Sequence, residues 1–426
     1  MKGIKFRLIV MNFLQFAVWG AYLTCMGTYL ATHNLASHIG LFYSIQGIVS
    51  IFMPALIGII ADRWIPAQKC LSFCHIISGI AMIAAAYYGL TAGDAVQFGP
   101  LFTLYTVGVA FYMPTLAISN SVAYNALEKA GLDTIKHFPP IRVFGTIGFI
   151  CSMWAVDLLG FQPTAAQFAV SGGLGIILGI YALTLPDCPT SATSTASFVD
   201  KLGLRAFTLF KDKRMAFFFI FSMLLGVSLQ ITNGFANPFI TSFGDIEIYK
   251  STFGVEHANI LISLSQVSET LCILLIPFFL RKFGIKKVML IAMFAWVLRF
   301  AFFGLGNPGD GVWLFVLSCI VYGVAFDFFN ISGSLFVDKE TDTGIRSSAQ
   351  GLFFLMTNGI GATIGTLGAQ AIVNHFVYNP AGNGAAPEVI AQGWQNAWYV
   401  FAAYALVVAI VFAIVFKYKH NPETAK

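Results

Sequence analysis

The sequence predicts an all-α membrane protein with twelve transmembrane helices arranged as two halves of six. The chain is 58% hydrophobic and only 10% charged, whereas a soluble domain carries about 25% charged residues. Its mean hydropathy is +0.78. Apolar runs of about 20 residues, the length of a helix that crosses a bilayer, recur along all 426 residues. Lys and Arg are concentrated in every second loop between these runs, which places them on one side of the membrane.

The apolar runs define the expected spans, and they must be helices because lipid satisfies no backbone polar group. Placing the N-terminus in the cytoplasm puts 22 of the 24 Lys and Arg residues on that side, together with the C-terminus. The exceptions are Lys250, in an outward loop, and Arg299, inside the ninth span. The expected spans are approximately 6–31, 38–61, 69–91, 98–122, 140–160, 167–185, 215–240, 257–280, 286–305, 312–337, 347–376 and 394–416.

The chain divides into an N-terminal half at 1–185, a cytoplasmic linker at 186–214 and a C-terminal half at 215–426. The linker is rich in Ser, Thr and Ala and then basic, which is typical of a flexible, partly amphipathic connection. The halves repeat, because GVAFY at 108–112 is matched by GVAFD at 323–327, and Gly20 is matched by Gly226. This pattern indicates an internal duplication, a plan that many transporters use with the ligand between the repeats.

Several function classes are disfavoured. The basic residues follow topology and form no patch, so nucleic-acid binding is not expected. The seven Cys residues lack metal-ligand spacing, and we expect neither a metal site nor a cofactor. A nucleotide-binding loop is missing from the sequence, so ATP-driven transport is not supported. Paired catalytic motifs are missing as well, so the protein is not expected to be an enzyme.

Polar and aromatic residues at helical spacing form stripes on four otherwise apolar spans, as expected for a water-accessible cavity between helices. The fifth span contributes Arg142, Thr146 and Phe149, the seventh Gln230 and Asn233, the eighth Gln266 and Glu269, and the tenth Tyr322, Phe326, Asp327, Asn330 and Ser334.

These residue types favour a neutral solute with a planar ring and several hydroxyls. Amides can pair with a base edge, carboxylates suit vicinal hydroxyls, and aromatic rings offer a stacking face. A cluster of Lys and Arg, which a phosphorylated ligand would require, is missing. A nucleoside fits best, and a sugar or other neutral polar solute is the alternative. A receptor or scaffold that does not transport is a further alternative, which the two buried acids disfavour.

Glu269 and Asp327 are the candidates for proton coupling. A lone carboxylate in a membrane is costly unless it is protonated or paired, and it can exchange a proton when a cavity opens to water. Three other ionisable residues have structural interpretations. For Arg299 and Asp157, near the outer ends of their spans, we expect snorkelling or a structural ion pair. For His75, in the third span, we expect a packing role.

The segment from Gly58 to Trp64 resembles the G-x-x-x-D-R/K-x-G-R/K signature of the major facilitator superfamily. It reads GIIADRW and is followed by Lys69, although Ile65 and Pro66 stand where a Gly is usual. The resemblance implies the major facilitator fold and a gating role for Gly58, Asp62 and Arg63. An acid and a base at this helix end can latch neighbouring helices in the outward-open state.

Longer segments resemble the nucleoside:proton symporters of that superfamily. They include FPPIRVFGTIGFI (138–150), SLSQVSETLCILLIPFFL (263–280) and VYGVAFDFFNISGS (321–334). The resemblance implies a bacterial inner-membrane importer that moves nucleosides together with protons by alternating access. It places the substrate between the halves, among the residues of the four stripes. We expect the chain to act as a monomer in the lipid bilayer.

Overall fold

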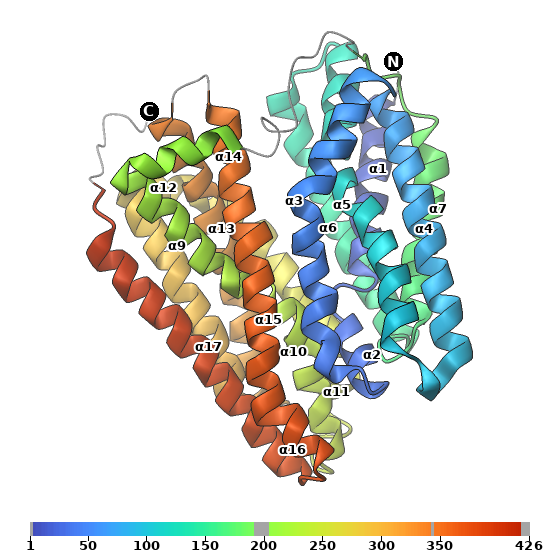
Figure 1. Ribbon diagram of the computed structural model, residues 1–426, viewed down its shortest axis with the longest axis vertical. Helices are drawn as coiled ribbons and strands as arrows, with labels where there is room; N and C mark the ends of the chain where they lie inside the picture. The colour runs from blue at the N-terminus through green and yellow to red at the C-terminus, as the bar shows by residue number, and fades with distance from the viewer. Residues whose placement is uncertain (1–2, 191–203, 342–344, 419–426) are drawn as a thin grey trace. The chain divides into compact units, whose positions relative to one another are not determined.

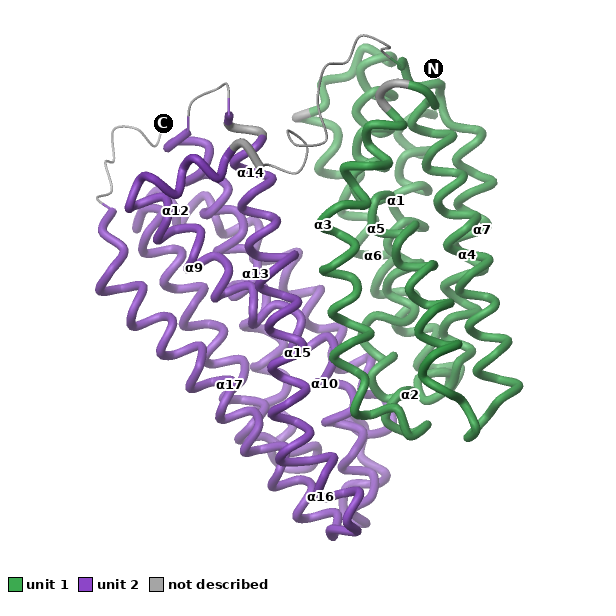
Figure 2. Tube along the Cα trace, viewed as in Figure 1, with its two compact units in different colours: residues 1–198 green, residues 199–426 purple. Residues whose placement is uncertain are grey.

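The computed structural model describes residues 3–190, 204–341 and 345–418, and within these it does not describe the side chains of 62–63, 135, 204–205 and 346–347. The described residues form helices and connecting turns and contain no strand. The chain divides into two compact units, Met1–Phe198 and Val199–Lys426 (Figure 2).

Unit 1 is built from long helices joined by short turns (Figure 1). Its elements are α1 (Ile4–Gly20), α2 (Met26–Thr32), η1 (Ala36–His38), α3 (Ile39–Arg63), α4 (Ala67–Ala92), η2 (Gly93–Ala95), α5 (Phe98–Lys129), α6 (Thr134–Leu158) and α7 (Ala166–Ala182).

Unit 2 contains the longest helix and the most interrupted one. Its elements are η3 (Leu204–Lys211), α9 (Lys213–Leu229), α10 (Ile231–Ser242), η4 (Phe243–Asp245), α11 (Phe253–Glu256), α12 (Ala258–Leu305), α13 (Val312–Glu340), α14 (Arg346–Phe354), η5 (Leu355–Gly361), α15 (Ala362–Val373), η6 (Asn374–Tyr378), α16 (Asn379–Gly382) and α17 (Pro387–Val415).

Each of the twelve expected spans coincides with a described helical stretch. Among the described residues, nine stretches are long and apolar enough to cross a membrane, and one of them, α12, is 48 residues long. Gly284 turns the chain inside α12 with φ 76° and ψ 166°, so that α12 contains both the eighth and the ninth expected spans. Glycine adopts this positive φ without the steric cost that a Cβ would bring. The two remaining spans coincide with α1–α2 and with the 17-residue α7.

Three spans are less regular than the sequence predicts. The first is interrupted between α1 and α2, and the seventh between α9 and α10 at Gln230. The eleventh contains two π-helical segments, η5 and η6. Irregular backbone at membrane depth is tolerated where the protein buries it, and π segments are frequent at functional sites. Hydrophobic periodicity carries no signal for such local changes of hydrogen bonding, which explains why the sequence predicts continuous helices here.

The same helix pairs pack together in both units, as a duplication requires. In unit 1, α1 packs on α6, and α4 packs on α5 and α7; in unit 2, α9 packs on η5 and α15, and α12 packs on α13 and α17. Glycines permit the first of these contacts. A Cβ on Gly20 would lie 2.4 Å from the Phe149 carbonyl oxygen, and a Cβ on Gly226 would lie 2.3 Å from that of Thr357.

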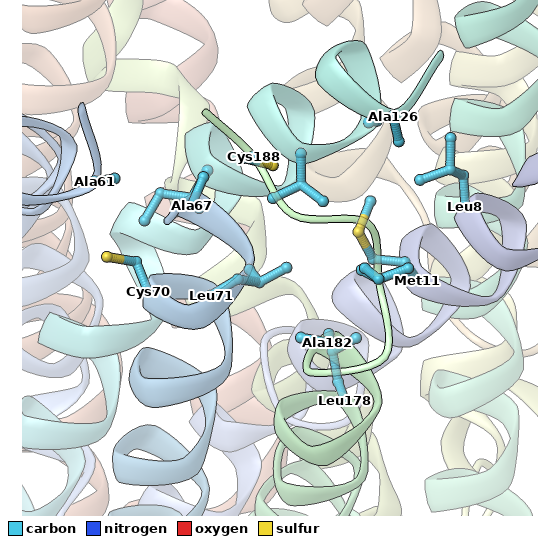
Figure 3. Close-up of a cluster of buried hydrophobic side chains, with 14 of the residues drawn as sticks. Leu8, Met11, Ala61, Ala67, Cys70, Leu71, Ala126, Leu178, Ala182 and Cys188 are labelled. Carbon is cyan, nitrogen blue, oxygen red and sulfur yellow. The ribbon is translucent and has the colours of Figure 1, made fainter. Parts of the chain in front are cut away.

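The core of unit 1 includes a cluster of small and aliphatic side chains (Figure 3). Leu8 and Met11 of α1 lie in it with Leu71 of α4 and Leu178 of α7, and all four are fully buried. The segment after α7 is fixed to α4, because the Gln68 amide donates to Asp187 over 2.6 Å and accepts from the Cys188 backbone N–H over 2.9 Å. This core holds the long helices that carry the candidate site residues.

Adding a methyl group at Gly20 or Gly226 should destabilise the unit that contains it. We expect Gly20→Ala and Gly226→Ala each to lower the unfolding free energy by about 1–3 kcal/mol, because a new methyl group would press against backbone atoms. The measurement is thermal unfolding of the detergent-solubilised protein. Gly173→Ala and Gly368→Ala are matched controls, since a Cβ at either position meets nothing within 4 Å. A melting temperature as high as that of the controls would contradict this account of the packing.

Candidate functional site

In unit 2, Tyr322 of α13 lies at the centre of the charged residues. Its hydroxyl interacts electrostatically with Glu269, Arg299 and Asp327. Tyr322 and Asp327 are each only 6% exposed. The structure therefore brings together both candidate proton carriers and one candidate aromatic residue, which lie on α12 and α13.

A glycine allows α12 and α13 to approach this closely. A Cβ on Gly323 would lie 2.5 Å from the Ser268 carbonyl oxygen and 2.8 Å from the Cys272 sulfur. The Ser268 hydroxyl also donates a short hydrogen bond to the Ile320 carbonyl oxygen of α13. These contacts bring α12 close to α13, and Tyr322 of α13 interacts electrostatically with Glu269 of α12.

Aromatic rings pack together near the acids. The rings of Tyr322 and Phe326 stack one helical turn apart, with centroids 5.5 Å apart and planes 14° apart. Trp296, from the second part of α12, meets Tyr322 edge-on at 6.0 Å. This arrangement fixes the plane of the Tyr322 ring.

Amide side chains lie on the neighbouring helices. Gln266 is 9% exposed, and its buried Oε1 has no hydrogen-bond partner among the described residues. Asn233 donates from Nδ2 to Gln230 Oε1 over 2.9 Å. Gln230 lies at the break between α9 and α10, so its side chain projects from an irregular stretch of backbone. Asn330 is partly buried on α13.

Ser334 is placed differently from the rest of its stripe. Its hydroxyl donates to Gln350 Oε1 over 3.0 Å, and the Gln350 amide donates back to the Ser334 carbonyl oxygen over 2.7 Å. This reciprocal pair joins α13 to α14, so the polar groups of Ser334 hold two helices together.

Arg299 is not a snorkelling residue, and the expectation of an ion pair is also wrong. It is 2% exposed, and among the described residues its guanidinium contacts hydroxyls, a carbonyl and aromatic rings but no carboxylate within salt-bridge distance. Its position near a span end suggested that it reaches the surface, but neighbouring helices provide partners inside the unit. The sequence did contain a signal, since an ionisable residue within a span is a functional candidate by default.

In unit 1, the three residues of the fifth span lie on α6 among aromatic side chains. The Arg142 guanidinium carbon lies 3.8 Å from the centroid of the Phe16 ring. Phe149 is 6% exposed and meets Trp19 edge-on at 6.2 Å. Thr146 is partly buried between them along the helix. The cation–π contact holds Arg142 against α1. Nothing in the sequence predicts this contact.

Unit 1 also contains a buried polar network that the sequence does not predict. The Gln15 amide donates to the Thr115 hydroxyl over 2.7 Å, and Gln15 Oε1 lies 2.7 Å from His75 Nε2. The Tyr112 hydroxyl donates to the Gln15 carbonyl oxygen over 2.8 Å. His75 therefore packs by hydrogen bonding across helices, in line with its expected packing role. Isolated polar residues on separate helices do not reveal such partners in sequence.

The signature segment lies at the end of α3, where Gly58 is partly buried. The side chains of Asp62 and Arg63 lie outside the described residues.

Comparison with known proteins identifies relatives along the full chain. The family model described as "Nucleoside H+ symporter" matches residues 1–421. The xanthosine permease of Escherichia coli is 46% identical over 429 residues, which cover 100% of this chain and 98% of that protein. The nucleoside permease NupG of Escherichia coli is also 46% identical, covering 98% of this chain and 97% of that protein.

Solved structures of other transporters share the fold of this chain. The crystal structure of a point mutant of the nucleoside transporter NupG matches with a TM-score of 0.90 at 46% identity, covering 97% of this chain and 100% of that chain. The peptide transporter PepTSo, at 12% identity and a TM-score of 0.70, covers 97% of this chain and 98% of that chain and shows the fold alone. These matches establish an all-α transporter fold, and the chain belongs to the nucleoside H+ symporter family.

Proposed function

We propose that this protein imports nucleosides together with protons across a bacterial inner membrane. The family assignment supports this activity, and the apolar helices support a multi-pass membrane protein. In this proposal the protein is a monomer, both termini lie in the cytoplasm, and the two units alternate access to a substrate bound between them. The sequence also leaves a sugar carrier open as an alternative, but none of the relatives named above is described as a sugar carrier.

The observation that carries the proposal is the group formed by Tyr322, Phe326 and the two acids. The partly buried Phe326 ring, held in place by stacking with Tyr322, can offer an apolar face to a planar base, while the carboxylates near it can accept hydrogen bonds from ribose hydroxyls. A sugar can pack only a small C–H face on an aromatic ring, whereas a nucleoside base presents a larger planar one. The group is therefore better matched to a nucleoside.

Gln266 adds a specific acceptor for the ligand. A buried polar atom without a hydrogen bond costs about 1–3 kcal/mol, and a base N–H or a ribose O–H could supply the missing donor. We propose that the substrate contacts residues of both units, namely Arg142, Thr146, Phe149, Gln230, Asn233, Gln266, Glu269, Tyr322, Phe326, Asp327, Asn330 and Ser334.

We assign proton coupling to Glu269 and Asp327. Both carboxylates interact with the same phenol, and Asp327 is nearly inaccessible to solvent. Carrying a proton inward together with the substrate would neutralise the charge that is costly at membrane depth, and the proton would leave to the cytoplasm before the empty protein returns. At the end of α3, Gly58, Asp62 and Arg63 are proposed to latch the outward-open state.

Substrate class can be tested by competition. In proteoliposomes with an imposed pH gradient, we expect unlabelled uridine or adenosine to displace labelled nucleoside, and free ribose to leave uptake unchanged. Ribose lacks the planar base that the aromatic face recognises. Displacement by free sugars but not by nucleosides would contradict the proposal and favour the sugar carrier.

Proton coupling can be tested with isosteric variants. We expect Asp327→Asn or Glu269→Gln, in at least one case, to reduce pH-driven accumulation to simple equilibration, because the amide cannot carry a proton. Uptake with and without an imposed pH gradient measures this effect. Asp310→Asn, an exposed carboxylate just before α13, is the matched control. If both site variants still concentrate nucleoside like the control, neither acid carries the proton.

A further inference from the structure

Arg299 is a buried cation at the meeting point of four expected spans. It lies on the second part of α12 and is 2% exposed. Its NH1 donates to the Ser318 carbonyl oxygen over 2.8 Å and to the Ser265 hydroxyl over 3.3 Å, and its NH2 donates to the Thr232 hydroxyl over 3.1 Å. The three acceptors lie on α13, on the first part of α12 and on α10.

Each acceptor lies close to a proposed substrate residue. Thr232 directly precedes Asn233, Ser265 directly precedes Gln266, and Ser318 lies one helical turn before Tyr322. A single guanidinium therefore binds all three helices that provide amides, acids and rings to the proposed site in unit 2.

The guanidinium also lies against the central aromatic ring. Its carbon is 4.4 Å from the centroid of Tyr322 and 5.4 Å from that of Phe303. A cation over a ring face is attracted by the ring quadrupole, more strongly where water is excluded. The Ser318 hydroxyl returns a hydrogen bond to the Arg299 carbonyl oxygen over 2.8 Å, which fixes the backbone on both sides of the contact.

We propose that Arg299 is a positioning residue for nucleoside binding, which fixes the Tyr322 ring and the relative positions of α10, α12 and α13 without touching the substrate. This inference rests on the proposed function of the site. The planar fork of arginine is needed, because it donates in several fixed directions while it stacks on a ring. Lysine retains the charge but offers one flexible ammonium group.

The test is nucleoside affinity of the folded protein. We expect Arg299→Lys to raise the Kd for uridine or adenosine, measured by titration calorimetry on purified protein, by about tenfold, the equivalent of one charge-assisted hydrogen bond. Arg281→Lys, at an exposed arginine also on α12, is the matched control and should bind like the wild type. A purely structural role would lower the melting temperature and leave the Kd of the folded fraction unchanged, and that result would overturn the proposal.

A double-mutant cycle tests whether the effect passes through Tyr322. In a Tyr322→Phe background, which keeps the ring, Arg299→Lys should still raise the Kd about tenfold. In a Tyr322→Leu background, which removes the ring, the factor should fall to about threefold or less, because coupled residues are not additive. Equal factors in both backgrounds would contradict positioning through the ring.

If Arg299→Lys does not fold, Thr232→Val provides the same test with a smaller change. It removes one hydrogen bond to the guanidinium and should raise the Kd for nucleoside severalfold. The matched control is Ser242→Ala, which should leave the Kd unchanged, because the Ser242 hydroxyl on α10 bonds to the Phe239 carbonyl oxygen of its own turn. An unchanged Kd for Thr232→Val would overturn the inference. Wild-type protein that binds no nucleoside would instead overturn the proposed function.

Discussion

Polar groups at membrane depth must find their partners inside the protein, because the hydrocarbon core supplies no hydrogen bonds. This constraint shapes both units. In unit 1, His75, Gln15 and Thr115 are hydrogen-bonded to one another across three helices. In unit 2, the NH1 and NH2 groups of Arg299 donate to acceptors on three helical segments, while its Nε has no partner among the described residues. In unit 2, the close contact at Gly323 also brings α12 and α13 together.

The same constraint separates structural polar residues from functional ones. The Ser334 hydroxyl donates to Gln350 and so joins α13 to α14, which leaves only its lone pairs to accept from a ligand. Gln266, in contrast, keeps a buried amide oxygen without a partner among the described residues. Polar residues that bond to a neighbouring helix set the shape of the site. Polar residues that keep a buried atom without a partner are the better candidates for contact with a ligand.

The sequence predicts the fold well because its signals are periodic and cumulative. Apolar runs and the placement of Lys and Arg in every second loop extend along the whole chain, and the four-residue GVAF motif recurs in both halves. Local backbone changes are not predicted, since the break at Gln230 and the π segments η5 and η6 depend on tertiary packing. The turn at Gly284, in contrast, lies between the expected spans 257–280 and 286–305, so the sequence does predict it.

The sequence predicts the placement of candidate site residues where they share one helix. It does not predict contacts whose partners come from several helices. The stripe from Tyr322 to Ser334 is readable as a helix face, and so is the pair of Gln266 and Glu269. By contrast, the stacking of Arg142 on Phe16 joins residues more than a hundred positions apart, and the partners of Arg299 come from three separate helical segments. A lone intramembrane arginine can be noticed in sequence, but its role requires the packed structure.

The central claim is that nucleoside and proton cross the membrane together. The most direct test adds uridine or adenosine to de-energised proteoliposomes in a weakly buffered medium and records the external pH. The account predicts that the medium becomes alkaline at the moment of addition, and that a proton ionophore abolishes the signal while nucleoside entry continues. Nucleoside entry with no change in external pH would contradict it.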